Sequence, residues 1–451
     1  LRKNINQIFQ NLISENISQN VKKFERKNIN FDSNNFFIWD IFFSEVFSKG
    51  GFDIIIGNPP YIYANNKKEK KIDENEIKYL KNKYKYIGRK INTYPIFVEK
   101  SKKLLKNNGT LSFIIPNNWL SSESLGEMRE DIFGCQNVKI TNINDKVFEN
   151  ASVDNSILSF TNIRSTNKLI KLYEYEKEIK FVGDVNSELL TYTKNKINYE
   201  LTKNKHLIFF LKQIEDKSTP LIKFCKTRQG PTPYAVGQGN PPQTKKMVAD
   251  KIYSSTLKKN ETYKKFTPGK DINRYYINWS GEYIKYGDNL ANKGNPFIFN
   301  NNRILIREIP SKSYYAINSV FTKDNFINNH SSIILYDFRD IHPFIINGIL
   351  NSKLFTFWFI LKLDKMQRKT FPRMTVKDVD KFIMLKNPFF NKKIFKEIIN
   401  LVSKKMIAKS KLDYDNKIDD LVYQLFKLKK KEKITIESYL REKFTIENFK
   451  N

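Results

Sequence analysis

The chain has 451 residues, which is enough for two or three domains with sizeable cores. Hydrophobic residues at 40% and aromatic residues at 14% exclude an intrinsically disordered chain. Lys and Arg number 79 against 47 Asp and Glu, and the resulting net charge of +32 indicates a polyanionic partner.

Nucleic acid is the polyanion that the composition favours, because no basic amphipathic helix dominates the chain. No run of 18 or more apolar residues occurs, and the N-terminal region lacks the apolar core of a signal peptide. The sequence therefore predicts a cytoplasmic protein without membrane contact. Cys135 and Cys225 are the only cysteines, beside three histidines, so no zinc site, disulfide framework or Cys–His nucleophile is expected.

In chain order, residues 1–35 are predicted to form a polar helical lead-in with Ile5, Phe9 and Leu12 on its apolar face. The apolar run at 54–56 predicts a buried parallel strand, which Gly57 and the following prolines end sharply. Ligands of open α/β sheets bind just past the carboxyl ends of strands. The tetrapeptide Asn58-Pro59-Pro60-Tyr61, here called the acceptor loop, therefore lies where chemistry is expected.

The composition of the acceptor loop suits the recognition of an exocyclic amino group. Asn58 offers a side-chain oxygen, and Pro59 offers a carbonyl with no neighbouring N–H at Pro60. Two such acceptors can hold both amino hydrogens while Tyr61 presents a ring for a base to stack on. A second Asn-Pro-Pro, at 240–242, follows no apolar strand and precedes no aromatic residue, so it is predicted to be a plain loop.

The segment from Phe52 to Tyr61 resembles motif IV of the DNA adenine-N6 methyltransferases. The preceding Trp39-Asp40, the Glu-Val-Phe at 45–47 and the Gly pair at 50–51 resemble the lead-in of type IIG restriction-modification enzymes. The resemblance implies methyl transfer from S-adenosylmethionine to an adenine flipped out of double-stranded DNA, with Asn58, Pro59, Pro60 and Tyr61 as the catalytic set. Asp40 is then a candidate for the acidic residue near the cofactor.

A Lys- and Asn-rich insert extends to about residue 90, as a solvated loop and helix or as a flap facing DNA phosphates. The segment 92–97 opens a predicted helix at 98–106 that Asn108-Gly109 ends, and 111–116 is the next predicted strand. This succession predicts a βαβ continuation of the sheet. It resembles motifs V and VI, which implies that Phe97 packs near the cofactor; a core role for Phe97 is equally compatible with the sequence.

Further strands are predicted at 138–143 and 156–161. The joint at 145–151 resembles motif VIII, which implies that Phe148 packs on the flipped adenine from the side opposite Tyr61. Without the resemblance, Phe148 would be an ordinary core residue at a strand end.

The second large unit shows short strand-like segments at 277–279, 283–286, 303–309 and 332–336 and an apolar helix at 343–361. Short segments at 269–275, 306–309, 349–353 and 371–373 resemble the target-recognition domain of type IIG methyltransferases. The resemblance implies DNA contacts by cations in these segments, namely Lys270, Arg274, Arg307, Lys353 and Arg373. Two charged amphipathic helices are expected from residue 389 onward.

The predicted fold class is α/β, with a partial Rossmann-like methyltransferase sheet, a mixed α+β target-recognition domain and a helical tail. The predicted divisions are a lead-in at 1–35, the C-terminal part of a catalytic domain at 36–163, a bridging segment at 164–204, the recognition domain at 205–387 and the tail at 388–451.

The Gly-rich cofactor motif of the family, usually located after the first strand, has no counterpart before residue 52. No paired acidic and Lys residues of a nuclease metal site are recognisable either. We therefore expect the C-terminal half of a larger enzyme, completed by an upstream polypeptide that carries the Gly-rich motif and a nuclease. The alternative is a DNA-recognition subunit, or a vestigial remnant, that binds DNA without methylating it.

Overall fold

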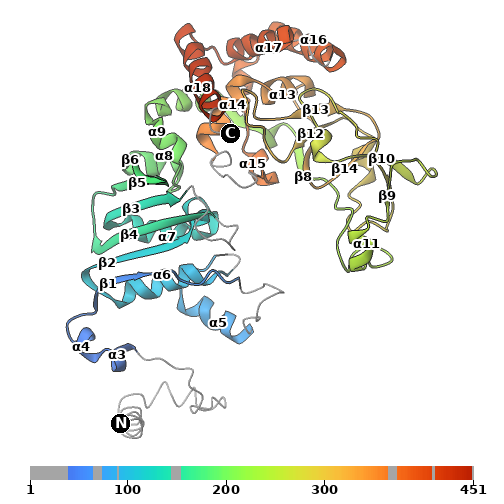
Figure 1. Ribbon diagram of the computed structural model, residues 1–451. Coiled ribbons are helices and arrows are strands. Elements are labelled where there is room, and N and C mark those ends of the chain that lie inside the picture. The colour runs from blue at the N-terminus through green and yellow to red at the C-terminus, as the bar shows by residue number, and fades with distance from the viewer. Residues whose placement is uncertain are drawn as a thin grey trace.

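The computed structural model describes residues 39–63, 74–88, 91–143, 154–363, 373–408 and 412–448. Within these ranges, Figure 1 shows a six-stranded sheet in the first part of the chain and a second unit of smaller sheets, with a group of helices near the C-terminus. The helix predicted at 1–35 lies outside the described residues.

The six-stranded sheet is mixed and has the strand order β1-β2-β4-β3-β5-β6. Its strands are β1 (Phe52–Gly57), β2 (Leu105–Pro116), β3 (Cys135–Ile143), β4 (Asn155–Arg164), β5 (Ile170–Glu176) and β6 (Glu178–Val185). The β1–β2 and β3–β5 pairs are parallel, and the other three pairs are antiparallel. All four strands predicted in this region are therefore present.

Helix α6 (Thr93–Leu104) links β1 to β2, so the predicted parallel βαβ unit is confirmed. The helix begins earlier than predicted because the side chain of Asn92 caps it, accepting a hydrogen bond from the Tyr94 N–H. It also ends earlier. Asn108-Gly109 does not terminate the helix, as predicted, but lies inside β2, which starts directly at Leu105.

The start of β1 depends on a close backbone approach at Gly51. This residue has a φ of +118°, and a Cβ atom there would lie 2.6 Å from the Leu104 carbonyl oxygen. Only glycine accommodates both conditions without strain. Gly51 thus sets the first strand against the junction of α6 and β2.

Helices cover one face of the six-stranded sheet. Leu111, Phe113 and Ile115 of β2 are buried in one core with Tyr94 and Val98 of α6 and with side chains of α7 (Gly126–Phe133). Most of the alternate strand residues, which point to the opposite face, are exposed or half-buried: Lys139, Ser112, Ile114, Ile157, Ser159, Tyr173 and Phe181. Among the described residues, this second face has no comparable helical cover.

The expectation that β1 is buried is wrong for two of its three isoleucines. Ile55 packs against the core, but Ile54 and Ile56 are 68% and 80% exposed. Within the described part of the chain, β1 pairs only with β2 and forms an edge of the sheet. The apolar sequence is that of a strand covered on both faces, whereas the described neighbours cover only one.

Residues 164–204, expected to bridge two domains, contribute largely to the first unit. β5 and β6 extend the sheet, and α8 (Ser187–Thr193) and α9 (Tyr199–Lys203) follow. The Tyr199 hydroxyl donates a hydrogen bond to the Ile140 carbonyl of β3 at 3.3 Å. The charged composition of this segment therefore marks the solvent-facing side of a strand pair rather than a linker.

The second unit contains two four-stranded sheets, ordered β14-β10-β11-β9 and β13-β12-β15-β8, and a β16-β7 pair. Their strands are β7 (Ser218–Pro220), β8 (Lys226–Gln229), β9 (Ser254–Ser255), β10 (Tyr263–Thr267), β11 (Tyr283–Lys285), β12 (Arg303–Arg307), β13 (Ser319–Thr322), β14 (Ile327–Asn328), β15 (Ser332–Tyr336) and β16 (Ile383–Leu385). Three predicted strands correspond to β11, β12 and β15, while 277–279 forms only an isolated bridge through Ile277. The second Asn-Pro-Pro lies in a turn, as predicted.

The helix predicted at 343–361 is two helices, α13 (Pro343–Leu350) and α14 (Lys353–Lys362). The break occurs where Ser352 caps α14 through its side chain and the Asn351 side chain turns to the backbone of Ser319. No single described helix is long and apolar enough to span a membrane. The two helices reach the required length and hydropathy only together, across a 63° bend, and most of their side chains are buried in the core.

The C-terminal part of the described chain forms three helices rather than the predicted two: α16 (Lys392–Ala408), α17 (Leu412–Leu425) and α18 (Lys430–Asn448). They lie beside α13 and α14 in Figure 1. The other described helices are α3 (Trp39–Phe42), α4 (Ser44–Phe47), α5 (Glu74–Lys83), α10 (Ile208–Asp216), α11 (Lys245–Ala249), α12 (Pro296–Phe299) and α15 (Val376–Asp380).

Candidate active site

The acceptor loop lies at the carboxyl end of β1, beside the carboxyl end of the parallel strand β2. Gly57, the last residue of β1, pairs with Phe113, and the loop follows at once. The Tyr61 hydroxyl reaches Ile114 of β2 and lies 2.8 Å from its carbonyl oxygen. The loop is therefore anchored at the sheet edge where ligands of α/β proteins bind.

The two expected acceptors differ in their surroundings. Asn58 is exposed, and its side-chain oxygen lies 2.7 Å from the Tyr61 hydroxyl. The Pro59 carbonyl accepts no hydrogen bond from any described residue, whereas the Pro60 carbonyl accepts one from the Thr93 hydroxyl. Pro59 is buried and Pro60 is exposed, so the two prolyl carbonyls differ in burial as well as in their hydrogen bonds to described residues.

Tyr61 is half-buried and contributes to the core. Its ring meets the ring of Tyr94 edge to face, with centroids 6.3 Å apart. Burial raises the pKa of Tyr61 to about 12, so its hydroxyl stays protonated at neutral pH. The single hydroxyl proton can be donated to Asn58 or to Ile114, and either bond holds the ring beside the loop.

Phe97, the expected cofactor contact, does not face the core. It is 45% exposed, although most of α6 around it is buried. Residues four apart share a helix face, so Phe97 lies on the same side of α6 as Thr93, which contacts the acceptor loop. The alternative of a core residue is therefore excluded.

Two other predicted residues cannot be placed. Phe148 lies outside the described residues. The backbone of Asp40 belongs to α3, but its side chain also lies outside the described part of the protein.

Several polar groups at the same sheet edge were not identified from the sequence. The Tyr94 hydroxyl donates to the Asn118 side-chain oxygen at 2.7 Å, and the Asn117 amide donates to the Asn142 side-chain oxygen at 3.1 Å. Asn117 and Asn118 directly follow β2. Their position just past a strand was the available signal, because it parallels that of Asn58.

The two thiols are unsuited to nucleophilic catalysis. Both cysteines are buried, and burial raises the pKa of Cys135 and raises that of Cys225 to about 12. No group of three or more His, Cys, Asp or Glu side chains in the described ranges could hold a metal ion.

In the second unit, three of the five predicted DNA-contacting cations lie on segments that converge. The Glu308 N–H, next to Arg307, donates to the Ser331 carbonyl, and Gly269, next to Lys270, packs against the same carbonyl. The Met374 N–H, next to Arg373, donates to the Glu308 carbonyl. Lys270 and Arg373 are exposed and Arg307 is half-buried, so these three side chains remain accessible to a ligand.

The other two predicted cations are engaged inside the protein. Arg274 donates to the carboxylate of Asp415 at 3.0 Å and lies 3.5 Å from the centre of the Tyr315 ring. Lys353 pairs with Glu437 of α18 at 2.9 Å. Both connect the second unit to the C-terminal helices, and we do not retain them as candidates for DNA contact.

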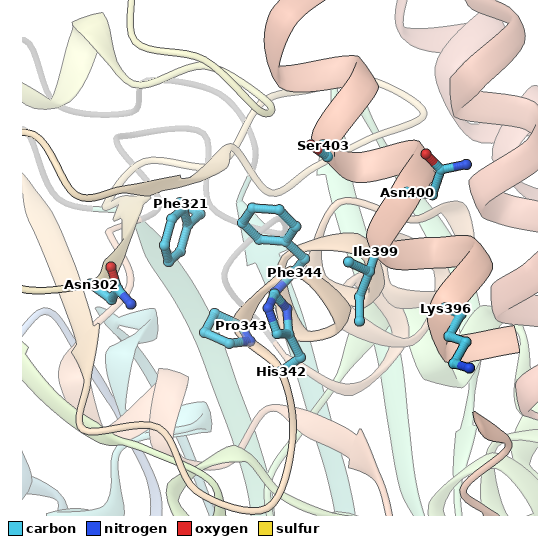
Figure 2. Close-up of a pocket in the computed structure, with 9 residues that line it drawn as sticks. All are labelled: Asn302, Phe321, His342, Pro343, Phe344, Lys396, Ile399, Asn400 and Ser403. Carbon is cyan, nitrogen blue, oxygen red and sulfur yellow. The ribbon is translucent and has the colours of Figure 1, made fainter. Parts of the chain in front are cut away.

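A cavity of about 410 Å³ lies where the start of α13 meets α16 (Figure 2). The rings of Phe321 and Phe344 form its apolar wall, with centroids 4.9 Å apart. His342 caps α13 there by accepting from the Phe344 N–H, and burial lowers the pKa of His342. The lining includes no residue of the acceptor loop or α6, so the cavity is separate from the candidate active site.

Two regions of the chain match known protein families. Residues 2–148, which contain the acceptor loop and α6, match the Eco57I restriction-modification methylase family. Residues 264–382, which contain Lys270, Arg307 and Arg373, match the TaqI-like C-terminal specificity domain. In these two regions the chain is similar to the methylases and the specificity domains of restriction-modification systems. We refer to 2–148 as the methylase region and to 264–382 as the specificity domain.

Two curated relatives show what share of such proteins the chain covers. It is 25% identical over 416 residues to RM.MjaORFECS2P of Methanocaldococcus jannaschii, an inferred type II restriction enzyme and methyltransferase, covering 86% of this chain but 32% of that protein. It is 38% identical over 81 residues to the type II methyltransferase M.TthHB8I of Thermus thermophilus, covering 17% of this chain and 19% of that protein. The chain thus spans a third or less of the length of these relatives.

The fold of the chain also occurs in a solved structure. The type IIL restriction-modification enzyme MmeI, determined in complex with DNA, matches with a TM-score of 0.54 at 15% identity. The match covers 87% of this chain and 57% of that chain, so it includes both the six-stranded sheet and the second unit. At this level of identity, the likeness concerns the fold alone.

Proposed function

We propose that this chain forms the target-base pocket and the DNA-recognition part of a methyltransferase that modifies adenine N6 in duplex DNA of the cytoplasm. One observation carries the proposal. Asn58 and Pro59 follow directly on the carboxyl end of β1, and the Asn58 side-chain oxygen lies 2.7 Å from the hydroxyl of half-buried Tyr61, while no described residue donates to the Pro59 carbonyl. The match to restriction-modification methylases supports the reaction class.

The acceptor loop would act by positioning and electrostatics. The lone pair of an adenine amino nitrogen is delocalised into the ring, which makes it a poor nucleophile. Hydrogen bonds from its two N–H groups to Asn58 and Pro59 favour a pyramidal nitrogen whose lone pair points away from the loop. No covalent intermediate with the protein is required, and the buried thiols are consistent with that.

The methyl donor proposed is S-adenosylmethionine, which supplies an electrophilic methyl group on a sulfonium. Of this chain's residues, exposed Phe97 on the loop-facing side of α6 fits an apolar contact to such a group. The described residues contain no Gly-rich turn that would hold its carboxylate and ribose. The chain therefore fits only the adenine-facing side of a cofactor site.

An adenine inside a duplex must leave the helix to reach Asn58. Stacking on Tyr61 would offset part of the unstacking cost of a few kcal/mol, and Phe148 is the proposed partner on the opposite side of the base. The proposed DNA contacts of the specificity domain are Lys270, Arg307 and Arg373. This domain would determine which sequence is modified.

We also propose that an additional polypeptide, which carries the Gly-rich motif and a nuclease, covers the face of the six-stranded sheet that the described residues leave uncovered. Support comes from Ile54 and Ile56, which are 68% and 80% exposed on a strand with one described neighbour. Burying an isoleucine contributes about 1.5–3 kcal/mol, so leaving both in water is costly. A parallel strand beside β1 would also satisfy its free backbone groups.

The decisive test combines cofactor binding with product analysis. Calorimetry should show very weak binding of S-adenosylmethionine to this chain alone, and tight binding would mean that no additional polypeptide is needed. With a polypeptide that carries the Gly-rich motif, the complex should convert adenine in unmodified plasmid DNA to N6-methyladenine. Methylcytosine as the sole product would refute the adenine assignment.

Asn58→Ala in the active complex should abolish methyl transfer while DNA affinity stays nearly unchanged, since the amide oxygen acts on the reacting amino group. Methylation within tenfold of wild type would refute the role of Asn58. DNA binding without methylation by the wild-type complex would favour the alternative, a recognition subunit without catalytic activity.

A further inference from the structure

The acceptor loop is held from two sides, and the second attachment is a single threonine. On one side, the Tyr61 hydroxyl reaches β2. On the other side, Thr93 at the start of α6 makes three hydrogen bonds. Its hydroxyl donates to the Pro60 carbonyl and accepts from the Ile62 N–H at 3.1 Å, and its own N–H donates to the Ile62 carbonyl at 3.0 Å.

These bonds distinguish the carbonyls of Pro59 and Pro60. The carbonyls of Pro59 and Pro60 are adjacent along the backbone. Pro59 is followed by Pro60, which has no N–H, whereas Pro60 is followed by Tyr61, which has one. The Thr93 hydroxyl engages the Pro60 carbonyl, while no described residue donates to the Pro59 carbonyl. A base amino group that binds the Asn58 oxygen with one hydrogen is therefore directed to Pro59 with the other.

The alternative is that Thr93 has only a structural role, as the first residue of α6. That role is already filled, because the N-cap of α6 is Asn92, whose side chain accepts from the Tyr94 N–H. The Thr93 hydroxyl makes no bond within the helix among the described residues and is directed at the loop instead. Its contacts span 31 and 33 residues of sequence.

We propose that Thr93 is a positioning residue for the methyl-transfer site, which holds the acceptor loop in register and reserves the Pro59 carbonyl for the target amino group. The inference rests on the proposed function and adds to it a distinction between residues that contact the base and a residue that positions them. Asn58 and Pro59 would contact the base, whereas Thr93 would act through them. Because loss of orientation by about 1 Å can cost roughly 100-fold in rate, a single hydroxyl here should have a large kinetic effect.

The test compares Thr93→Val with Thr93→Ser in the full chain combined with the cofactor-binding polypeptide. Valine preserves the shape but can neither donate to Pro60 nor accept from Ile62, whereas serine can do both. We expect kcat of the valine variant to fall about 10- to 100-fold with KM for plasmid DNA within twofold, and the serine variant to stay within threefold of wild type. Thr191→Val, which removes a 2.8 Å hydroxyl–carbonyl bond in α8, is the matched control and should leave kcat unchanged.

Two kinetic outcomes overturn the proposal: a valine variant within threefold of wild-type kcat, or equal losses in the valine and serine variants, which would indicate packing rather than the hydroxyl. A second measurement separates this inference from the proposed function. Exchange of the Ile62 amide hydrogen should accelerate at least tenfold in Thr93→Val and return in Thr93→Ser, because Thr93 is its acceptor. If the wild-type complex methylates nothing, the proposed function fails, and unchanged Ile62 exchange in the valine variant would overturn the loop attachment as well.

Discussion

Replacing Asp419 with Asn should change the way in which the stability of the protein depends on pH. Asp419 of α17 is 2% exposed and accepts hydrogen bonds from the Lys353 N–H at 2.9 Å and from the Tyr315 hydroxyl at 2.8 Å. The Lys353 ammonium lies farther away, at 3.9 Å. Burial is the largest influence and raises the pKa of Asp419 from 3.8 to about 7.

The sign follows from comparing the folded and unfolded states. Well below pH 3.8 the carboxyl is protonated in both states, so its titration costs nothing. Between pH 4 and 7 the unfolded chain has released the proton and the folded chain retains it, so stability falls as pH rises. A shift of about 3 units corresponds to roughly 4 kcal/mol lost between pH 4 and 8. Asn cannot titrate, so the variant lacks this loss.

Urea unfolding followed by circular dichroism measures the effect if wild type and Asp419→Asn are compared at each pH. Other titrating groups cancel in the difference, which should change by about 4 kcal/mol in favour of the variant from pH 4 to 8. Asp420→Asn, at the exposed neighbouring residue, controls for the loss of a surface carboxyl. A difference that stays constant with pH, or that increasingly favours wild type as pH rises, would refute the reasoning.

Three further predictions concern stability and DNA binding. Asp415→Ala removes the buried partner shared by Arg274 and Lys405 and should cost about 3–5 kcal/mol in urea unfolding; a loss below 1 kcal/mol would contradict it. Gly51→Ala places a Cβ atom at a residue with a φ of +118°, 2.6 Å from the Leu104 carbonyl oxygen, so the free energy of unfolding should fall by about 1–3 kcal/mol in thermal unfolding. An unchanged midpoint temperature would contradict that geometry. Alanine at Lys270, Arg307 and Arg373 together should lower the slope of log affinity against log salt by roughly 2 to 3 in filter binding; an unaltered slope would exclude phosphate contacts there.

The C-terminal helices connect the two units of the chain. Glu200 of α9 accepts hydrogen bonds from Tyr439 and Lys443 of α18, and Lys353 of α14 pairs with Glu437 of the same helix. Through α18, the unit with the six-stranded sheet and the second unit are joined by buried and partly buried polar contacts. A rigid connection of this kind would keep the recognised sequence in a fixed position relative to the acceptor loop.

Much of the local structure around the candidate site was predictable from the sequence, because its causes act over a few residues. Gly57 and two prolines end a strand wherever it lies, so the position of the acceptor loop at a strand end followed from residues 52–61 alone. The succession of strand, helix and strand that forms the βαβ unit was likewise local. The chemical suitability of Asn58 and Pro59 as acceptors also required only their covalent structure.

Tertiary structure decided the features that depend on partners far along the chain. Thr93 meets Pro60 across 33 residues, and Arg274 meets Asp415 across 141, so neither the engagement of the Pro60 carbonyl nor the internal role of Arg274 was visible in any sequence window. The exposure of Ile56 depends on which strands and helices surround β1. The break between α13 and α14 depends on the hydrogen bonds between Asn351 and Ser319. Local patterns report what a residue can do, whereas burial and pairing depend on neighbours that only the folded chain brings together.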